Sequence, residues 1–194
     1  MSAPPKHSTP VLALTAAVAL LCSPACTRSA PAPEAEPAPQ PEPAAVASID
    51  PATLLPNGAE PFPGILTGGQ PTREQLDEAS SLGIRTVINL RTPGESDIGQ
   101  ADVEARGMTY VAIPIAGDGL TAANAAAFAA ALDAAERPAI VHCGSGNRVG
   151  ALFALAAYYQ DGADPEAAIE LGKKAGLTRL EPAVREHLAA AVRD

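Results

Sequence analysis

The sequence predicts an α/β fold, an open and mainly parallel sheet with helices on both of its faces. Between residues 64 and 142, short apolar and β-branched runs alternate with helix-forming segments in the order strand, helix, strand, helix, strand, helix, strand. Strands joined by helices run parallel, because the helical crossover returns the chain to the same end of the sheet. The last strand opens into a glycine-rich turn, and such sheets bind ligands at the carboxyl ends of their strands.

The first elements follow from turn and capping signals. Residues 64–67 indicate a short strand. Thr72, with Gln75 three residues later, forms a capping box that predicts a helix to about Ser81. Residues 84–90 are rich in β-branched side chains and predict a buried strand.

The next elements repeat this alternation. Residues 97–106 predict a second helix, and residues 108–115 predict the next strand. Residues 116–119 turn the chain, and Thr121 caps an alanine-rich helix that extends to about Ala135.

The last strand and a group of helices complete the prediction. Residues 138–142 form the strand that precedes the glycine-rich turn, and residues 149–159 form a helix after it. Asp164 with the following proline predicts another helix start, and Pro182 opens the last helix. We expect these C-terminal helices to cover the sheet.

The N-terminal segment has the pattern of a secretory signal. Residues 11–22 are almost wholly apolar and follow a segment that carries Lys6, and they are too short to span a bilayer as a mature helix. Small residues then precede Cys26, which resembles a bacterial lipoprotein processing site with Cys26 as the lipidated residue. Ser23 stands where a large aliphatic residue is usual, so ordinary cleavage is the alternative. We expect residues 1–26 to be a signal peptide ending in this site.

These features predict an exported protein. It is either a lipoprotein on a bacterial membrane, facing the periplasm or the outside, or a periplasmic or secreted protein if it is not lipidated. Residues 27–56 are dominated by Pro, Ala and Glu and predict a disordered tether, which leaves residues 57–194 as the globular domain. From Glu60 onward there are 11 Lys and Arg against 18 Asp and Glu, an acidic balance that argues against a nucleic-acid partner.

The clearest functional signal is Cys143, followed by a glycine-rich loop and Arg148. Cys22 and Cys26 belong to the leader, so Cys143 is an unpaired thiol in an exported protein. A helix N-terminus and an arginine would stabilise its thiolate, which is the form that attacks.

The loop residues Gly144, Ser145, Gly146 and Asn147 are the expected substrate-binding residues. Their backbone N–H groups could surround an anion while Arg148 holds two of its oxygens in a bidentate fork. The phosphorus of a phosphoryl group bound in this way would face the cysteine sulfur. This chemistry requires no metal and no cofactor.

From about residue 64 to its C-terminus, the chain resembles the family related to dual-specificity protein tyrosine phosphatases, and the phosphatase-like domain of beta-lactamase-hydrolase-like proteins. The resembling segments are residues 66–71, 87–91, 110–114 and 142–148. The resemblance implies a cysteine-phosphatase fold and a general acid on the loop after the preceding strand. Asp118 occupies the matching place, and Asp97 is the weaker alternative.

Two further residues are expected to support the site. The resemblance implies that His142 lies behind the cysteine and holds the loop by hydrogen bonds, while a satisfied core histidine is the other interpretation. Arg91 either adds positive potential at the edge of the sheet or pairs with Glu95, and the pairing is favoured.

The chain departs from the phosphatase pattern in two ways. Four residues rather than five separate Cys143 from Arg148, a spacing shared with rhodaneses, and Val149 stands where a Ser or Thr hydroxyl is usual. The principal prediction is a cysteine-dependent phosphatase-like hydrolase, acting on a phosphorylated protein or a small phosphate ester through a cysteinyl-phosphate intermediate. The alternatives are a rhodanese-like sulfurtransferase and a tethered anion-binding module with little turnover.

Overall fold

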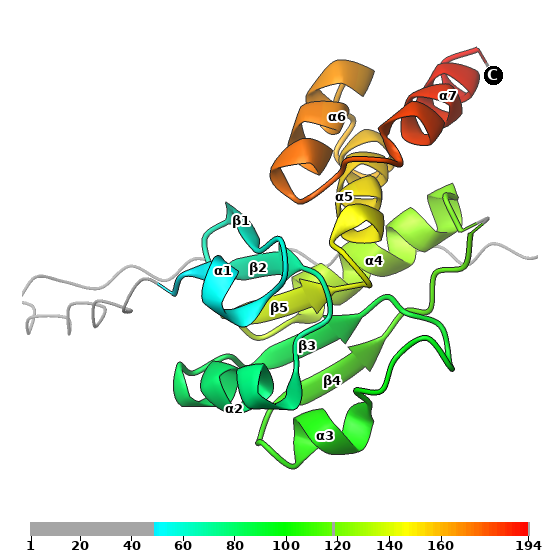
Figure 1. The fold of residues 1–194 in the computed structure, drawn as a ribbon. Coiled ribbons are helices and arrows are strands. Elements are labelled where there is room, and N and C mark those ends of the chain that lie inside the picture. Colours follow the sequence, from blue (N-terminus) through cyan, green and yellow to red (C-terminus); the bar gives the residue numbers. More distant parts are fainter. Residues whose placement is uncertain (1–48, 118, 194) are drawn as a thin grey trace, which may run out of the picture. The chain divides into compact units, whose positions relative to one another are not determined.

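The computed structural model describes residues 49–117 and 119–193, and its sheet has five strands in the order β1-β2-β5-β3-β4 (Figure 1). Strand β1 pairs antiparallel with β2, whereas β2, β5, β3 and β4 are parallel to their neighbours. The strands are β1 (Ala59–Phe62), β2 (Ile65–Gly68), β3 (Thr86–Asn89), β4 (Thr109–Ala112) and β5 (Ala139–His142).

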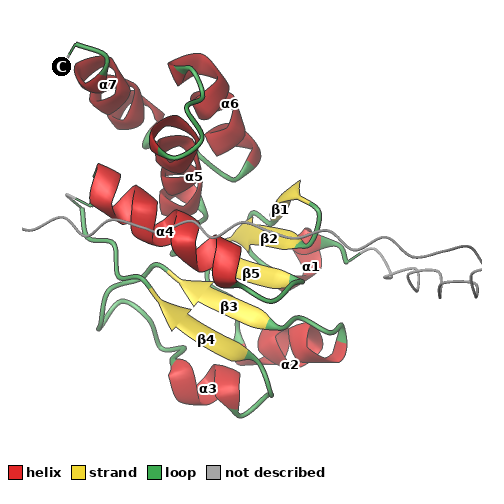
Figure 2. Ribbon diagram, turned by 180° about the vertical axis from the view of Figure 1, so that it is seen from behind, coloured by secondary structure: helices red, strands yellow, loops and turns green. Residues whose placement is uncertain are grey.

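Helices cover both faces of this sheet, as Figure 2 shows from behind. The central strand β5 supplies both apolar cores, because alternate side chains of a strand point to opposite faces. Ile140 packs in the core with α1–α3, and Val141 packs in the core with α4–α7. The helices are α1 (Pro51–Leu54), α2 (Arg73–Ser81), α3 (Gln100–Glu104), α4 (Ala122–Ala134), α5 (Asn147–Tyr159), α6 (Pro165–Lys174) and α7 (Glu181–Ala191). The predicted fold class is confirmed.

The capping signals in the sequence mark helix starts correctly. Thr72 forms both hydrogen bonds of the capping box with Gln75, and the Thr121 side chain accepts from the backbone N–H of Asn124. Asp164 caps α6 by accepting from two backbone N–H groups of its first turn. These side chains satisfy N–H groups that have no partner within the helix.

The N-terminal boundary of the fold differs from the prediction. Residues 51–54, assigned to the tether, form helix α1, and Leu54 and Leu55 are fully buried beneath α2 and β2. Strand β1 was not predicted either. Both elements are four residues long and contain proline, so neither shows a full period of apolar residues.

The C-terminal helices pack on α5 through a close backbone approach. Gly150 lies in the second turn of α5, and a Cβ atom there would lie 2.0 Å from the backbone nitrogen of Leu177. Only glycine permits this contact, which brings the segment between α6 and α7 close to the first turns of α5. Within the part of the chain described here, no helix has the length and apolar character needed to cross a membrane.

Candidate active site

The centre of the sheet positions Cys143. Strand β5 lies between β2 and β3, and His142 at its end is in register with Gly68 and Asn89. Cys143 follows directly, and its backbone N–H donates to the carbonyl oxygen of Gly68 at 3.2 Å. The cysteine is 1% exposed and lies on the wall of a cavity of about 880 Å³.

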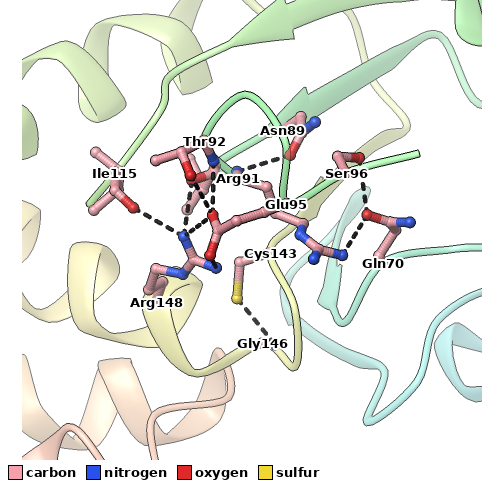
Figure 3. Close-up of polar contacts among 11 residues, drawn as sticks. Gln70, Asn89, Arg91, Thr92, Glu95, Ser96, Ile115, Cys143, Gly146 and Arg148 are labelled. Atoms are coloured by element: carbon pink, nitrogen blue, oxygen red, sulfur yellow. Dashed lines mark hydrogen bonds and ion pairs between the residues drawn. The ribbon is translucent and has the colours of Figure 1, made fainter. Parts of the chain in front are cut away.

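The loop after Cys143 converts a strand into a helix within four residues. Gly146 makes this possible because its φ of 88° lies in the left-handed region, which glycine adopts readily and other residues rarely adopt. Its backbone N–H donates to Sγ of Cys143 at 3.2 Å (Figure 3). No side chain caps α5, so its first-turn N–H groups are available to an anion at the cavity.

Arg148 lies in the first turn of α5, and its guanidinium contacts Glu95 and the carbonyl oxygens of Ile115 and, at 3.5 Å, Leu90 (Figure 3). Nη1 donates to the carbonyl oxygen of Ile115 at 2.8 Å and to Oε2 of Glu95 at 2.9 Å. Nη2 donates to Oε1 of Glu95 at 3.1 Å. A guanidinium has five N–H groups, so Nε–H and one Nη2–H have no partner among the described residues. These two groups form the edge that can hold two oxygens of one anion.

Glu95 is a fixed counter-charge in this arrangement. Hydrogen bonds from Arg148, and from the backbone N–H and hydroxyl of Thr92, lower the pKa of the Glu95 carboxyl to about 2. Glu95 is therefore ionised near neutral pH. The favoured pairing of Arg91 with Glu95 is wrong, because Glu95 turns toward Arg148 instead.

Arg91 lies on the cavity wall but points toward a different neighbour (Figure 3). Its Nη1 donates to Oε1 of Gln70 at 2.5 Å, and the hydroxyl of Ser96 donates to the same oxygen at 2.8 Å. The Nε of Arg91 is buried without a hydrogen-bond partner among the described residues. Arg91 therefore adds positive charge to the site without forming an ion pair there.

His142 is wholly buried behind the cysteine, and neither ring nitrogen has a hydrogen-bond partner among the described residues. The expected support of the loop by ring hydrogen bonds is therefore not formed, nor is the ring a satisfied core histidine. Burial is the main cause that lowers the pKa of His142 to about 4. The Cys143 backbone opposes this shift, and the nearby charge of Arg91 adds a smaller lowering effect. The ring is neutral near pH 7 and packs as part of the interior.

The chain resembles proteins of known family over this same region. Residues 65–159 match the family model "Beta-lactamase hydrolase-like protein, phosphatase-like domain". Residues 65–159 are thus similar to a phosphatase-like domain. Beta-lactamase hydrolase-like proteins of Xylella fastidiosa strain Temecula1 and Agrobacterium fabrum are 36% and 32% identical to the chain over 93 residues. The match covers 45% of this chain but only 22% of each relative.

Solved structures show that this phosphatase-like domain has the fold of cysteine phosphatases. TpbA of P. aeruginosa aligns with a TM-score of 0.55 at 21% identity, covering 76% of this chain and 95% of TpbA. Tk-PTP in its active form aligns with a TM-score of 0.54 at 18% identity, covering 70% of this chain and 97% of Tk-PTP. The predicted resemblance to protein tyrosine phosphatases is confirmed.

Asn147 has a different role in the phosphatase-like domain from the one predicted for it. It lines the cavity, but its Oδ1 accepts from the backbone N–H of Thr178 at 2.9 Å, the hydroxyl of Thr178 at 3.3 Å and the N–H of Leu180 at 3.2 Å. Asn147 thereby fixes the segment that carries Arg179, an exposed residue that also lines the cavity.

Sequence reasoning missed the roles of Glu95, Gln70 and Arg179 in this site. Gln70 lies in one of the segments that resemble phosphatases, and this was the only signal that could have found it. Arg179 lies in a short polar stretch between helices, which is typical of an exposed turn.

The other predicted residues divide into three groups. Gly144 and Ser145 line the cavity as expected, whereas Asp97 does not line it and instead accepts from Nε2 of Gln70. Asp118 and Cys26 lie outside the described residues. In the described ranges, no group of three or more His, Cys, Asp or Glu is arranged to hold a metal ion.

The buried His142 makes the stability of the phosphatase-like domain sensitive to acid. Its pKa is 6.5 when unfolded and about 4 when folded, so between these pH values the unfolded chain binds a proton that the folded chain does not. We expect the free energy of unfolding to fall by roughly 3 kcal/mol between pH 7 and pH 4 on this account. His142→Leu should remove this component in urea titrations at each pH. If the free energy of unfolding falls with pH by the same amount in the wild-type chain and in the variant, His142 is not the source of the acid sensitivity.

Proposed function

We propose that the phosphatase-like domain hydrolyses a phosphate ester through a cysteinyl-phosphate intermediate on Cys143. The observation that carries the proposal is the convergence of three groups on one cavity. These groups are the Cys143 sulfur with its Gly146 N–H donor, the uncapped start of α5, and the unoccupied edge of the Arg148 guanidinium. Together they provide a nucleophile and donors for an anion that is attacked in line.

In the first step, the Cys143 thiolate attacks phosphorus and the S–P bond forms as the P–O ester bond breaks. The departing oxygen takes a proton from the carboxyl group of Asp118. In the second step, Asp118 accepts a proton from water as the water oxygen attacks phosphorus. The S–P bond then breaks, which releases inorganic phosphate and restores the thiolate.

Two observations support Asp118 as this acid. Gly117 and Leu120 line the cavity on either side of it in the sequence. The other carboxyl groups considered fit less well, because Glu95 is held ionised by Arg148 and Asp97 does not line the cavity.

The substrate we infer is a phosphorylated protein or a small phosphate ester. A variant of TpbA with cysteine replaced by serine has been solved with phosphotyrosine, at 20% identity and a TM-score of 0.51 to this chain. A cavity of about 880 Å³ has room for more than a phosphate group. The phosphatase-like relatives do not favour the sulfurtransferase alternative.

We also infer that the domain acts outside the cytoplasm. The support is the apolar run at residues 11–22, the small residues before Cys26, and the Pro/Ala/Glu-rich stretch that follows. A lipid on Cys26 would hold the domain on a bacterial membrane.

The phosphatase proposal predicts distinct losses in variants of the purified full chain. With an aryl phosphate as substrate, Cys143→Ser should abolish phosphate release, because a serine hydroxyl is a far weaker nucleophile than a cysteine thiolate. Asp118→Asn should lower kcat by about 100-fold or more, because the leaving oxygen is no longer protonated. Asp97→Asn is the matched control and should stay within about twofold of wild type.

Parallel assays with thiosulfate and cyanide identify the rival activity. Sulfur transfer that survives Asp118→Asn, with no phosphate release by the wild-type chain, would overturn the proposal in favour of a sulfurtransferase. If neither activity is found while phosphate protects Cys143 from alkylation, the domain is an anion-binding module.

The export proposal predicts a modified N-terminus. Mass spectrometry of the chain recovered from bacterial membranes should find an acylated Cys26 as the first residue. A free N-terminus at another position, on chain recovered from the soluble fraction, would show that the lipid anchor is absent.

A further inference from the structure

The cavity carries more positive charge than one phosphate group requires. Among the described residues that line it, three are arginines and Glu95 alone is acidic. Glu95 is paired with Arg148, so Arg91 and Arg179 have no carboxylate partner among the described residues. This local excess is notable because the chain as a whole has a formal net charge of −9.

The position of Arg179 is built into the fold. The N–H groups of Thr178 and Leu180, on either side of it, both donate to Oδ1 of Asn147, which is 8% exposed. The backbone is also close-packed here, because a Cβ atom on Gly176 would lie 3.1 Å from the carbonyl oxygen of Gly146. The segment bearing Arg179 is thus fixed to the anion-binding loop itself.

The two unpaired arginines differ in what they can reach. Arg91 donates to Gln70 and its Nε is buried, so its guanidinium is held against the wall of the site. Arg179 is exposed, and the structure gives its side chain no hydrogen bond or ion pair with another described residue. Arg179 is therefore the group that is free to meet a substrate at the mouth of the cavity.

We propose that Arg179 binds a second anionic group of the substrate, so that the preferred substrates are phosphate monoesters bearing another phosphate or a carboxylate. This inference rests on the proposed function and narrows its substrate class. The reacting phosphate occupies the start of α5 and the free edge of Arg148. The second anion accepts hydrogen bonds from Arg179 at the cavity mouth, where a charge-assisted contact strengthens binding.

The test compares three esters: phenyl phosphate, 4-carboxyphenyl phosphate and 1,4-phenylene bisphosphate. Arg179→Ala should lower kcat/KM for the two esters with a second anion by about tenfold or more, and for phenyl phosphate by less than about twofold. Comparing variants on the same ester cancels differences between leaving groups. Lys174→Ala is the matched control, because it removes an exposed cation at the end of α6 that does not line the cavity. It should leave kcat/KM unchanged for all three esters.

A binding measurement keeps this inference separate from the proposed function. In calorimetry, Cys143→Ser should bind the esters with a second anion more tightly than phenyl phosphate, and adding Arg179→Ala should remove that advantage. If the wild-type chain turns over no ester but this preference holds, the phosphatase proposal fails and the second-anion site stands. If Arg179→Ala lowers kcat/KM equally for all three esters, or for none of them, the proposed role of Arg179 is wrong.

Discussion

The passage from β5 into α5 is the constraint on which the site depends. The chain has only the residues between His142 and Asn147 to change from an extended to a helical backbone. Gly146 makes this turn with a positive φ and donates its N–H to the Cys143 sulfur. The same turn places the helix N-terminus and Arg148 at the cavity, so one backbone path sets the positions of the Cys143 sulfur and of these N–H donors.

The side chains around this turn orient the site rather than react. Glu95 and the carbonyl oxygen of Ile115 hold Arg148 in one orientation, leaving one edge of its guanidinium for an anion. Asn147 uses its side-chain oxygen to hold the segment that carries Arg179. Asn147 and Arg148, the first two residues of α5, thus connect the cavity by hydrogen bonds to two segments that are distant in the sequence.

Much of this could be predicted from local sequence. The capping box at Thr72, the strand before Cys143 and the glycine-rich turn are short-range patterns. They predicted the sheet and the position of Cys143 at the end of its central strand. The roles of Glu95 and Arg179 could not be predicted in this way, because they depend on which segments meet in space. Arg91 and Arg148 both end near the same sheet edge, and sequence alone offered no means to decide which of them Glu95 pairs with. Helix α1 and strand β1 were hidden for another reason, since four-residue elements with proline show too little periodicity.

The central claim is that Cys143 carries the phosphoryl group during turnover. The most direct measurement is to mix the full chain with an aryl phosphate, quench in acid within milliseconds, and analyse the peptide that contains Cys143 by mass spectrometry. The account predicts a phosphoryl adduct on Cys143. With 4-nitrophenyl phosphate, whose leaving group departs without a proton, this adduct should accumulate when Asp118 is replaced by Asn, because only the second step then lacks its catalyst. Substrate turnover with no adduct on this peptide, or an added sulfur atom in its place, would contradict it.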